Sequence, residues 1–376
     1  MIPLMALACY ATVVAAPEPD DLTARQLAGA ARSDDFERAW AAIEQLRQRG
    51  ADAQGYLVDA LEHQLERHAR IIAARTDHVE RMGSLEERFA RWESDRRDAW
   101  RTLRRMRSDA DVRKALGNRR RLEQQFAQID RLAGFELDLA ELVLQGRQLA
   151  ALYEDVTDEA ATETPTDAAI DAAIEAATEA LGLSVKQLEE VLRFDPKRPP
   201  RSRATQRLWF VNLCGRVEAY NRGQAELCDG GEFAMVQQIN AYRRAMGVKP
   251  LEIDPRLTQA ARRYSKSMVD LGFQGHRSPE QGLETPHRRM IAAGHPRPFS
   301  ENVVTGSTNA TVMFNALLES PSHHLNTLNR FSTQIGVGRW DDHWTQNYGM
   351  GPWLMLMDAS RRDQVEVKGE PLGPQR

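Results

Sequence analysis

Between residues 20 and 155, apolar side chains recur at intervals of three and four positions. Phe36, Trp40, Ile43 and Leu46 form one such run. This spacing places apolar residues on one face of an α-helix. Arg, Glu and Gln fill many of the intervening positions, and Gly and Pro are rare. The pattern predicts a few long amphipathic helices in an all-α bundle or an antiparallel coiled coil. No heptad repeat is clean enough to name an oligomeric state, and self-association through these helices stays an open alternative.

In the last third of the chain, helical periodicity gives way to alternation. Apolar residues at helical spacing predict helices at 233–246, 257–271 and 310–318. Alternating residues predict strands at 335–340 and 343–348, joined by a short turn, and a last strand at 353–357. Helices followed by antiparallel strands indicate the α+β class and not a parallel βαβ array.

The composition changes between these two parts. Residues 156–207 begin as an acidic stretch rich in Ala and Thr, with a short Ala-rich helix expected from Thr166. They end in the Pro-rich run from Phe194 to Pro200, which stops regular structure. We therefore expect a helical domain at 20–155, a linker at 156–207 and a C-terminal domain at 208–376.

Charge is nearly balanced over the 376 residues, with 50 Lys and Arg against 54 Asp and Glu. No global basic field indicates a nucleic-acid partner. One part of the helical region is locally basic, from Arg96 through Arg107 to Arg121. A solvated helix face explains these charges, and binding of an anionic polymer or a lipid head group is the alternative.

The first 16 residues, Met1 to Ala16, carry no charge and are mostly apolar. They are too short for a membrane-spanning helix, which needs ~20 apolar residues. They fit the hydrophobic region of a secretory signal peptide, although a basic start is missing and Pro17 follows. The run Ala6 to Cys9 resembles an imperfect lipoprotein box. We expect an extracytoplasmic protein, secreted or periplasmic, with lipid anchoring through Cys9 as the alternative.

Cys214 and Cys228 are the other cysteines. In an oxidising compartment a disulfide between them is expected. Two reduced, buried thiols are the alternative. A metal site is discounted because this pair offers too few local ligands.

Three short motifs in the C-terminal domain carry the candidate chemistry. They centre on His276, on Glu301 with Asn302, and on His323 after the Ser320-Pro321 turn. Two imidazoles and a carboxylate are side chains that can build a polar or metal-binding cleft. They are tens of residues apart, so spacing alone does not bring them together. The sequence contains neither a Gly-rich phosphate loop nor a nucleophile elbow.

These motifs belong to a longer ordered series. The series is Ile239-Asn240-Ala241-Tyr242-Arg243, Leu251 to Leu257, Ala261 to Met268, His276-Arg277-Ser278-Pro279, Thr285-Pro286 through Gly294, Glu301-Asn302, Ser320-Pro321-Ser322-His323 with Asn326, Ile335-Gly336-Val337-Gly338, and Trp344 to Gly349. In this order it resembles the CAP superfamily (cysteine-rich secretory proteins, antigen 5 and pathogenesis-related proteins), also called the SCP domain, in its compact bacterial form. The resemblance covers residues 233–350.

The resemblance implies an α-β-α sandwich and a cleft with two histidines and two acidic residues. His276, Glu301 and His323 match three of these groups. The second acid falls on Ser320, and the adjacent Glu319 should point ~100° away on an ideal helix. The trio would suit Zn²⁺ or another divalent cation, with water completing the coordination. His287, His295, His324 and His343 are interpreted as surface residues.

Three functions remain in competition. The first is an exported module that binds a small ligand, a lipid or a cell-surface component in the cleft, without catalysis. The second is a metal-dependent hydrolase of peptide or cell-wall material. The third is a structural protein that binds its partner through the helical region. The missing second acid favours the first, because a hydrolase would have to use Glu301 as its general base.

Overall fold

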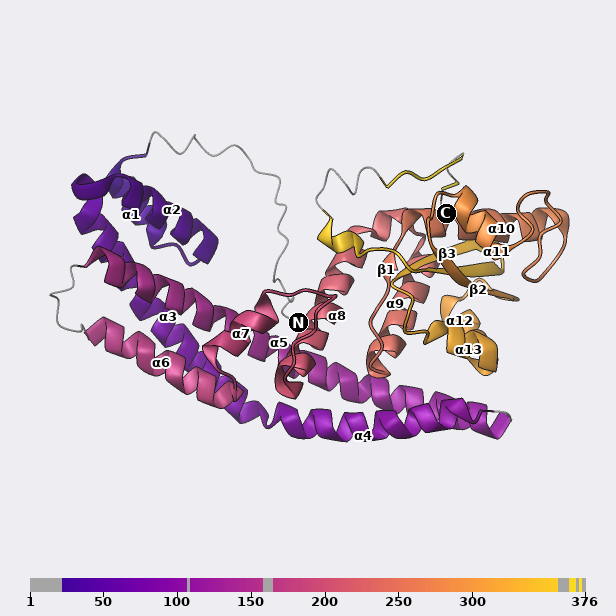
Figure 1. The fold of residues 1–376 in the computed structure, drawn as a ribbon, viewed down its shortest axis with the longest axis horizontal. Coiled ribbons are helices and arrows are strands. Elements are labelled where there is room, and N and C mark those ends of the chain that lie inside the picture. The colour runs from indigo at the N-terminus through magenta and orange to yellow at the C-terminus, as the bar shows by residue number, and fades with distance from the viewer. Residues whose placement is uncertain (1–21, 107–108, 158–164, 358–364, 370–371, 374–376) are drawn as a thin grey trace. The chain divides into compact units, whose positions relative to one another are not determined.

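A computed structural model describes residues 22–106, 109–157, 165–357, 365–369 and 372–373 (Figure 1). The expected signal segment 1–16 and Cys9 lie outside these residues. The chain divides into two compact units. Unit 1 contains residues up to Leu85, Arg131–Phe194 and Pro199–Trp209, and unit 2 contains Glu86–Asp130, Asp195–Arg198 and the residues from Phe210 onward. No helix within the described residues is long and apolar enough to cross a membrane.

Unit 1 is all-helical, as the apolar spacing predicts. Its elements are α1 (Ala24–Ala31), α2 (Phe36–Gln48), η2 (Gly50–Ala53), α3 (Gln54–Met82), α6 (Pro165–Leu181), α7 (Val185–Leu192) and parts of α5 (Asp109–Val156) and α8 (Arg203–Gly223). Leu57, Leu61, Leu65 and Ile72 form the buried stripe of α3, along which α6 packs (Figure 1). Burial of this stripe stabilises the bundle, since a long helix gains most of its stability from packing.

Unit 2 is built on a four-stranded sheet in the order β1-β3-β4-β2. Its other elements are α4 (Leu85–Arg104), η3 (Ala225–Leu227), α9 (Gly230–Ala245), β1 (Glu252–Ile253), α10 (Pro255–Leu271), α11 (Pro286–Ala292), β2 (Pro298–Thr305), α12 (Ala310–Glu319), α13 (Pro321–Thr327), β3 (Gln334–Trp340), β4 (His343–Gly349) and η4 (Leu354–Leu356). The β3–β4 and β2–β4 pairs are antiparallel, and the short β1 is parallel to β3. The α+β class and the α-β-α layers are confirmed, with α10 on one side of the sheet and α12 and α13 on the other (Figure 1).

The strand expected at 353–357 is wrong. The chain there forms the short 3-10 helix η4. The carboxylate of Glu252 accepts the backbone N–H groups of Leu354 at 2.6 Å and Met355 at 3.0 Å. A side chain that binds two successive N–H groups holds the segment in a turn, so those groups cannot join a ladder.

Helix α10 packs directly on the backbone of β3. The helix starts at the Asp254 cap, whose side chain accepts the N–H groups of Arg256 and Leu257. A Cβ added at Gly336 or Gly338 would lie within 3.0 Å of α10 backbone atoms. The two glycines of the Ile335-Gly336-Val337-Gly338 motif therefore permit a close helix–sheet approach that any side chain would obstruct.

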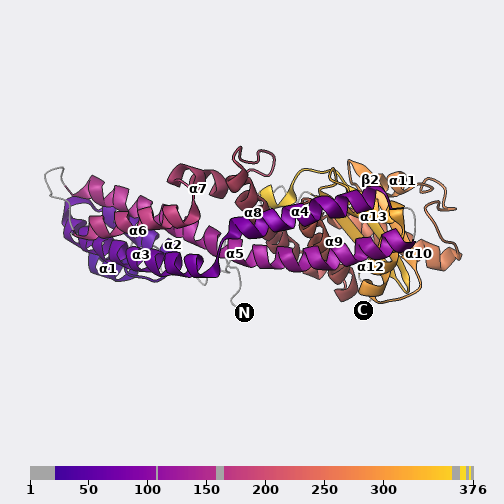
Figure 2. The same cartoon turned by 90° about the horizontal axis from the view of Figure 1, so that it is seen from below.

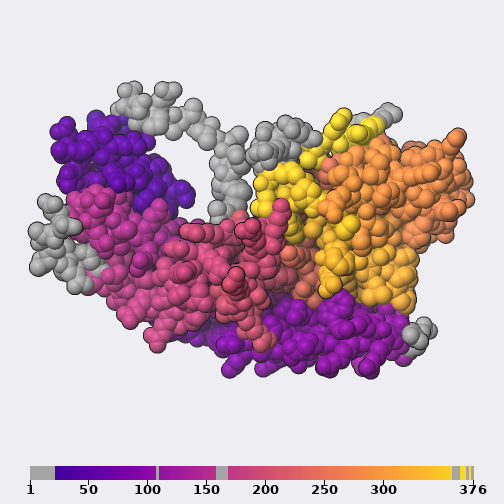
Figure 3. Space-filling view, in the orientation of Figure 1, coloured from indigo at the N-terminus to yellow at the C-terminus, as the bar shows by residue number. Residues whose placement is uncertain are grey.

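Helix α4 and the first half of α5 lie side by side within unit 2 (Figure 2). The indole of Trp92 donates to the carbonyl of Ala245 at 2.8 Å, and that of Trp100 donates to Met246 at 3.1 Å. Arg119 of α5 donates to Asn315 of α12 at 2.9 Å. The surface of this helix pair accordingly adjoins that of α12 and α13 (Figure 3). This part of the helical region is thus structurally integrated with the C-terminal sheet.

Candidate functional site

Three predicted side chains meet beside β2, the edge strand of the sheet. His276 lies in the loop after α10, Glu301 on β2 and His323 on α13. His276 Nδ1 is 2.9 Å from Glu301 Oε1, and the rings of His276 and His323 are 6.3 Å apart between centroids. The side chain of His276 is 48% exposed, whereas that of Glu301 is 1% exposed. We call this group the His276–Glu301–His323 cluster.

A buried arginine that the sequence analysis missed completes the environment of Glu301. Arg289 of α11 donates to both carboxylate oxygens, at 2.9 and 2.7 Å. Its guanidinium also lies 3.3 Å from the ring centroid of Tyr264, a cation–π contact. A buried carboxylate on a strand requires a cation or several N–H donors. The need of Glu301 for a cationic partner could have been inferred from the sequence. The sequence contains too many arginines, however, to identify Arg289 as that partner.

The hydrogen bonds of Glu301 determine the tautomer of His276. The carboxylate is ion-paired with Arg289 and can only accept hydrogen bonds. Nδ1 of His276 must therefore carry a proton. In the neutral imidazole this leaves the lone pair on Nε2, which is the usual consequence of a carboxylate behind a histidine.

Asn302 helps to position the helix that carries His323. Its amide donates to the His323 carbonyl at 3.2 Å and to Gln346 of β4 at 3.0 Å. The side-chain amide of Asn326 donates to Oδ1 of the Asn302 side chain at 3.0 Å. The predicted cleft residue Asn302 is fully buried. It therefore links α13 to the sheet and is not placed to meet a ligand.

Ser320 occupies the junction of α12 and α13. It ends the first helix and precedes Pro321 of the second, and its hydroxyl lies 3.1 Å from that of Ser322. The neighbouring Glu319 is exposed at the end of α12. Ser320 supplies no carboxylate, so the cluster contains one acidic side chain from the predicted set.

The cluster does not fit the three-ligand metal site considered from the sequence. The described residues contain no group of three or more His, Cys, Asp or Glu side chains placed to hold a metal ion. Glu301 directs one oxygen at His276 and both at Arg289. Catalytic zinc sites use three protein ligands, and two imidazoles alone fall short of that number.

His323 is expected to be neutral at pH 7. Burial lowers its pKa below the ordinary 6.5, and the nearby His276 lowers it further. In an NMR titration of the ring signals, His323 should titrate below pH 6.5. His276→Ala should raise this pKa, because it removes a like charge and admits water. A His323 midpoint at or above 6.5 in the unaltered protein would contradict this assignment.

Two histidines interpreted as surface residues are in fact fully buried, so that interpretation is wrong for them. His324 contacts the Tyr242 hydroxyl at 2.7 Å and the Leu318 carbonyl at 2.9 Å, and burial lowers its pKa to about 4. His295 contacts Gln334 at 2.8 Å. Hydrogen-bond partners from distant segments satisfy both rings, which sequence spacing does not reveal. His287 is exposed and His343 is partly buried.

The expected disulfide is also wrong, since Cys214 and Cys228 are free and buried. Cys214 lies in α8, nine residues before the helix ends at Gly223. Cys228 lies on a different element, directly after η3, and the two buried thiols are not joined.

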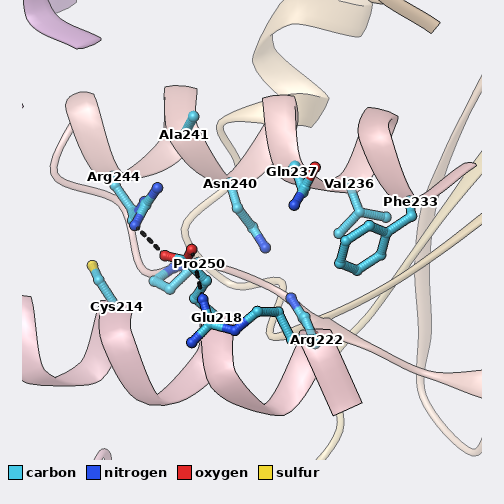
Figure 4. Close-up of a pocket in the computed structure, with 11 residues that line it drawn as sticks. Cys214, Glu218, Arg222, Phe233, Val236, Gln237, Asn240, Ala241, Arg244 and Pro250 are labelled. Carbon is cyan, nitrogen blue, oxygen red and sulfur yellow. Dashed lines mark hydrogen bonds and ion pairs between the residues drawn. The ribbon is translucent and has the colours of Figure 1, made fainter. Parts of the chain in front are cut away.

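Cys214 lines a pocket of about 220 Å³ between α8 and α9 (Figure 4). Arg244 of α9 and Glu218 of α8 form an ion pair across it at 2.9 Å. Burial raises the pKa of Cys214 well above its usual range. The thiol therefore stays protonated, and this pocket lacks an activated nucleophile.

These layers and motifs define a CAP domain in the C-terminal region. Residues 236–348 match the family described as CAP, the cysteine-rich secretory protein family. The uncharacterized protein YkwD of Bacillus subtilis (strain 168) is 34% identical over 119 residues, which cover 31% of this chain and 46% of that protein. The chain thus spans less than half the length of this curated relative.

Solved structures also share similarity with the chain. An extracellular protein containing an SCP domain from Bacillus anthracis is 22% identical, with a TM-score of 0.31, covering 41% of this chain and 45% of that one. An outer surface protein from Borrelia burgdorferi is 23% identical, with a TM-score of 0.30, covering 33% of this chain and 95% of that one.

Proposed function

We propose that the CAP domain is an extracellular ligand-binding module whose contact point is the His276–Glu301–His323 cluster. The observation that carries this proposal is the hydrogen bond between His276 and Glu301, with Glu301 already paired to Arg289. It holds the half-exposed His276 ring in one orientation with Nε2 available to a ligand. The oriented His276 ring, with the His323 ring 6.3 Å away between centroids, offers a polar anchor for a ligand of the cell surface. Export to that location is part of the proposal and rests on the apolar run from Met1 to Ala16.

The metal-dependent hydrolase has less support. It would need a general base as well as metal ligands. Glu301 is the only acid of the predicted set in the cluster, and Arg289 and His276 bind its oxygens. Ser320 stands at the position where the CAP resemblance places the second acidic residue of the cleft. A binding role requires only the imidazoles and the paired carboxylate of the His276–Glu301–His323 cluster, without a general base or a metal.

Co-sedimentation with purified peptidoglycan sacculi tests the binding proposal. The intact protein should pellet with the sacculi, and His276→Ala and His323→Ala should each weaken retention about tenfold, as expected for the loss of a buried polar contact of ~1.4 kcal/mol. His287→Ala is the matched control, because it removes an exposed imidazole outside the cluster.

If the intact protein is not retained, the protein does not bind sacculi. If all variants are retained equally, binding does not use the His276–Glu301–His323 cluster. Calorimetric titration with Zn²⁺ tests the metal-dependent alternative separately. Stoichiometric Zn²⁺ binding that His276→Ala abolishes would revive the hydrolase alternative at the expense of the metal-free module.

A further inference from the structure

Helix α4 and the first half of α5 carry an unusual concentration of positive charge, outside the matched CAP region. Residues 97–121 contain 10 Lys and Arg against 3 Asp and Glu, a net charge of +7. The whole chain has a net charge of −4, so the remaining residues together carry −11. A strong field of one sign over a short stretch of an otherwise acidic protein favours a partner of the opposite charge.

The arginines of this stretch gather on the side of the helix pair that faces away from the CAP domain, the side seen in Figure 2. On an ideal helix Arg97 lies ~140° from the buried Trp92, and Arg113 lies ~180° from the buried Leu122. Five exposed arginines share this side, and we call them the arginine face. They are Arg97, Arg104, Arg105, Arg113 and Arg120.

Side-chain contacts set the alignment of α4 against α5. Arg88 donates to Gln128 at 3.3 Å, and Gln125 donates to Asp95 at 2.8 Å. Residue numbers rise on one helix as they fall on the other, so the pair is antiparallel.

This alignment brings the arginines together in pairs. Arg97 is level with Arg120, and Arg104 is level with Arg113. Seven helical residues rise ~10 Å, which is the separation of the two pairs along the helices. Like charges gathered on so short a strip repel one another, and an anion bound among them relieves that repulsion.

The acids of the same region are engaged by other groups. Asp98 pairs with Arg101 at 2.7 Å, and Glu123 pairs with Arg119 at 2.9 Å. Asp111 also interacts with another group. Within the described parts of the chain, the arginine face therefore makes no ion pair with an acidic side chain.

The chemistry of this surface narrows the choice of partner. Among the described residues, no large apolar or aromatic side chain of α4 or α5 is exposed. Single-stranded nucleic acids are bound by stacking their bases on aromatic rings. Helices that lie on membranes bury an apolar face in the lipid. A partner of the arginine face therefore needs repeated negative charge, but neither bases nor acyl chains.

Duplex DNA is a poorer fit than a flexible polyanion. Two packed helices are together ~20 Å across, which is wider than the ~12 Å major groove. The remaining residues of the chain, with a net charge of −11, repel a long stiff polyanion. A flexible polymer can follow the arginines and avoid the acidic parts.

We propose that the arginine face binds a flexible phosphate polymer, such as a polyol phosphate of the cell envelope, through guanidinium contacts with successive phosphates. The planar guanidinium group can bind two oxygens of one phosphate. The indoles of Trp92 and Trp100 fix α4 on the CAP domain through their bonds to Ala245 and Met246. The arginines are thus presented by a firmly docked helix, which lowers the entropic cost of binding.

Calorimetric titration of the full chain with long-chain inorganic polyphosphate tests the proposal. Binding should be saturable, and its affinity should fall steeply as salt rises, because the polymer releases counterions when it binds. The variant Arg97→Gln/Arg104→Gln/Arg113→Gln/Arg120→Gln should bind at least about tenfold more weakly, with a shallower salt dependence. Glutamine favours helices nearly as well as arginine does, so this variant should remain folded.

The matched control is Arg25→Gln/Arg38→Gln/Arg70→Gln/Arg81→Gln, which makes the same change in net charge at exposed positions of unit 1. It should leave the affinity within about twofold of the unaltered protein. His276→Ala should also bind polyphosphate normally, which separates this proposal from the binding role of the His276–Glu301–His323 cluster.

Equal affinities of the two fourfold variants would show that binding does not use the arginine face. Tighter binding of duplex DNA or of phosphatidylglycerol vesicles, compared at equal phosphate concentration, would overturn the choice of a flexible polymer. Absence of saturable polyphosphate binding at low salt would remove the proposal.

Discussion

Replacing Gly338 by alanine is expected to destabilise unit 2 by about 3 kcal/mol or more. The added Cβ would lie within 3.0 Å of backbone atoms of Ala261 and Arg262 in α10. Backbone atoms of a buried helix cannot turn aside as a long side chain can, so helix and sheet must separate. For a unit of this size the loss corresponds to a melting temperature lower by about 6–12 °C.

Gly215→Ala is the matched control for this experiment. Gly215 lies within α8, and a Cβ there would meet nothing within 4 Å. Alanine favours a helix over glycine by ~1 kcal/mol, so this variant should melt at the same temperature or slightly higher. Calorimetry of the full chain will resolve the transition of unit 2. A Gly338→Ala protein that melts like the Gly215→Ala protein would show that α10 does not pack on β3 as described.

Replacing Arg289 by methionine is expected to cost about 3–5 kcal/mol, because it leaves the buried carboxylate of Glu301 without its counter-charge. The two side chains are 5% and 1% exposed. The variant also loses the guanidinium from the Tyr264 ring. Chemical denaturation followed by a probe of unit 2, such as near-ultraviolet circular dichroism, will measure the loss.

The neighbouring residue provides the control. Arg288 lies on the same helix and pairs with Glu284, and these two side chains are 60% and 36% exposed. Arg288→Met should therefore change stability by no more than about 0.5 kcal/mol. The double variant Arg289→Met/Glu301→Gln should recover part of the Arg289→Met loss, since it removes the stranded charge. Similar stabilities for Arg288→Met and Arg289→Met would refute the buried ion pair.

The two predictions also bear on the proposed binding site. Gly338 lies on β3, and Glu301 lies on β2 across β4. Arg289 touches Glu301 directly. A variant that folds but orients His276 poorly should retain less ligand than the intact protein. Ligand retention by the folded fraction thus separates loss of stability from loss of the site.

Periodicity in the sequence was sufficient to predict much of the architecture. The run of Phe36, Ile43 and Leu46 predicted the helix that became α2, and alternation predicted β3 and β4. Strand β2 escaped prediction because its buried and exposed residues do not alternate cleanly. The segment 353–357 was mistaken for a strand because its turn depends on Glu252, a hundred residues away.

Local sequence determined where many of the helices and the strands β3 and β4 form, because 3.6- and two-residue spacings of apolar side chains are properties of neighbouring positions. Ordered motifs also singled out His276, Glu301 and His323. Only the tertiary structure decided that Arg289 neutralises Glu301, that His295 and His324 are buried, and that the cysteines stay apart. Those outcomes depend on which distant groups share a low-dielectric interior, and no spacing along the chain encodes that pairing. The contact of Trp100 in α4 with Met246 likewise joins segments that are far apart along the chain.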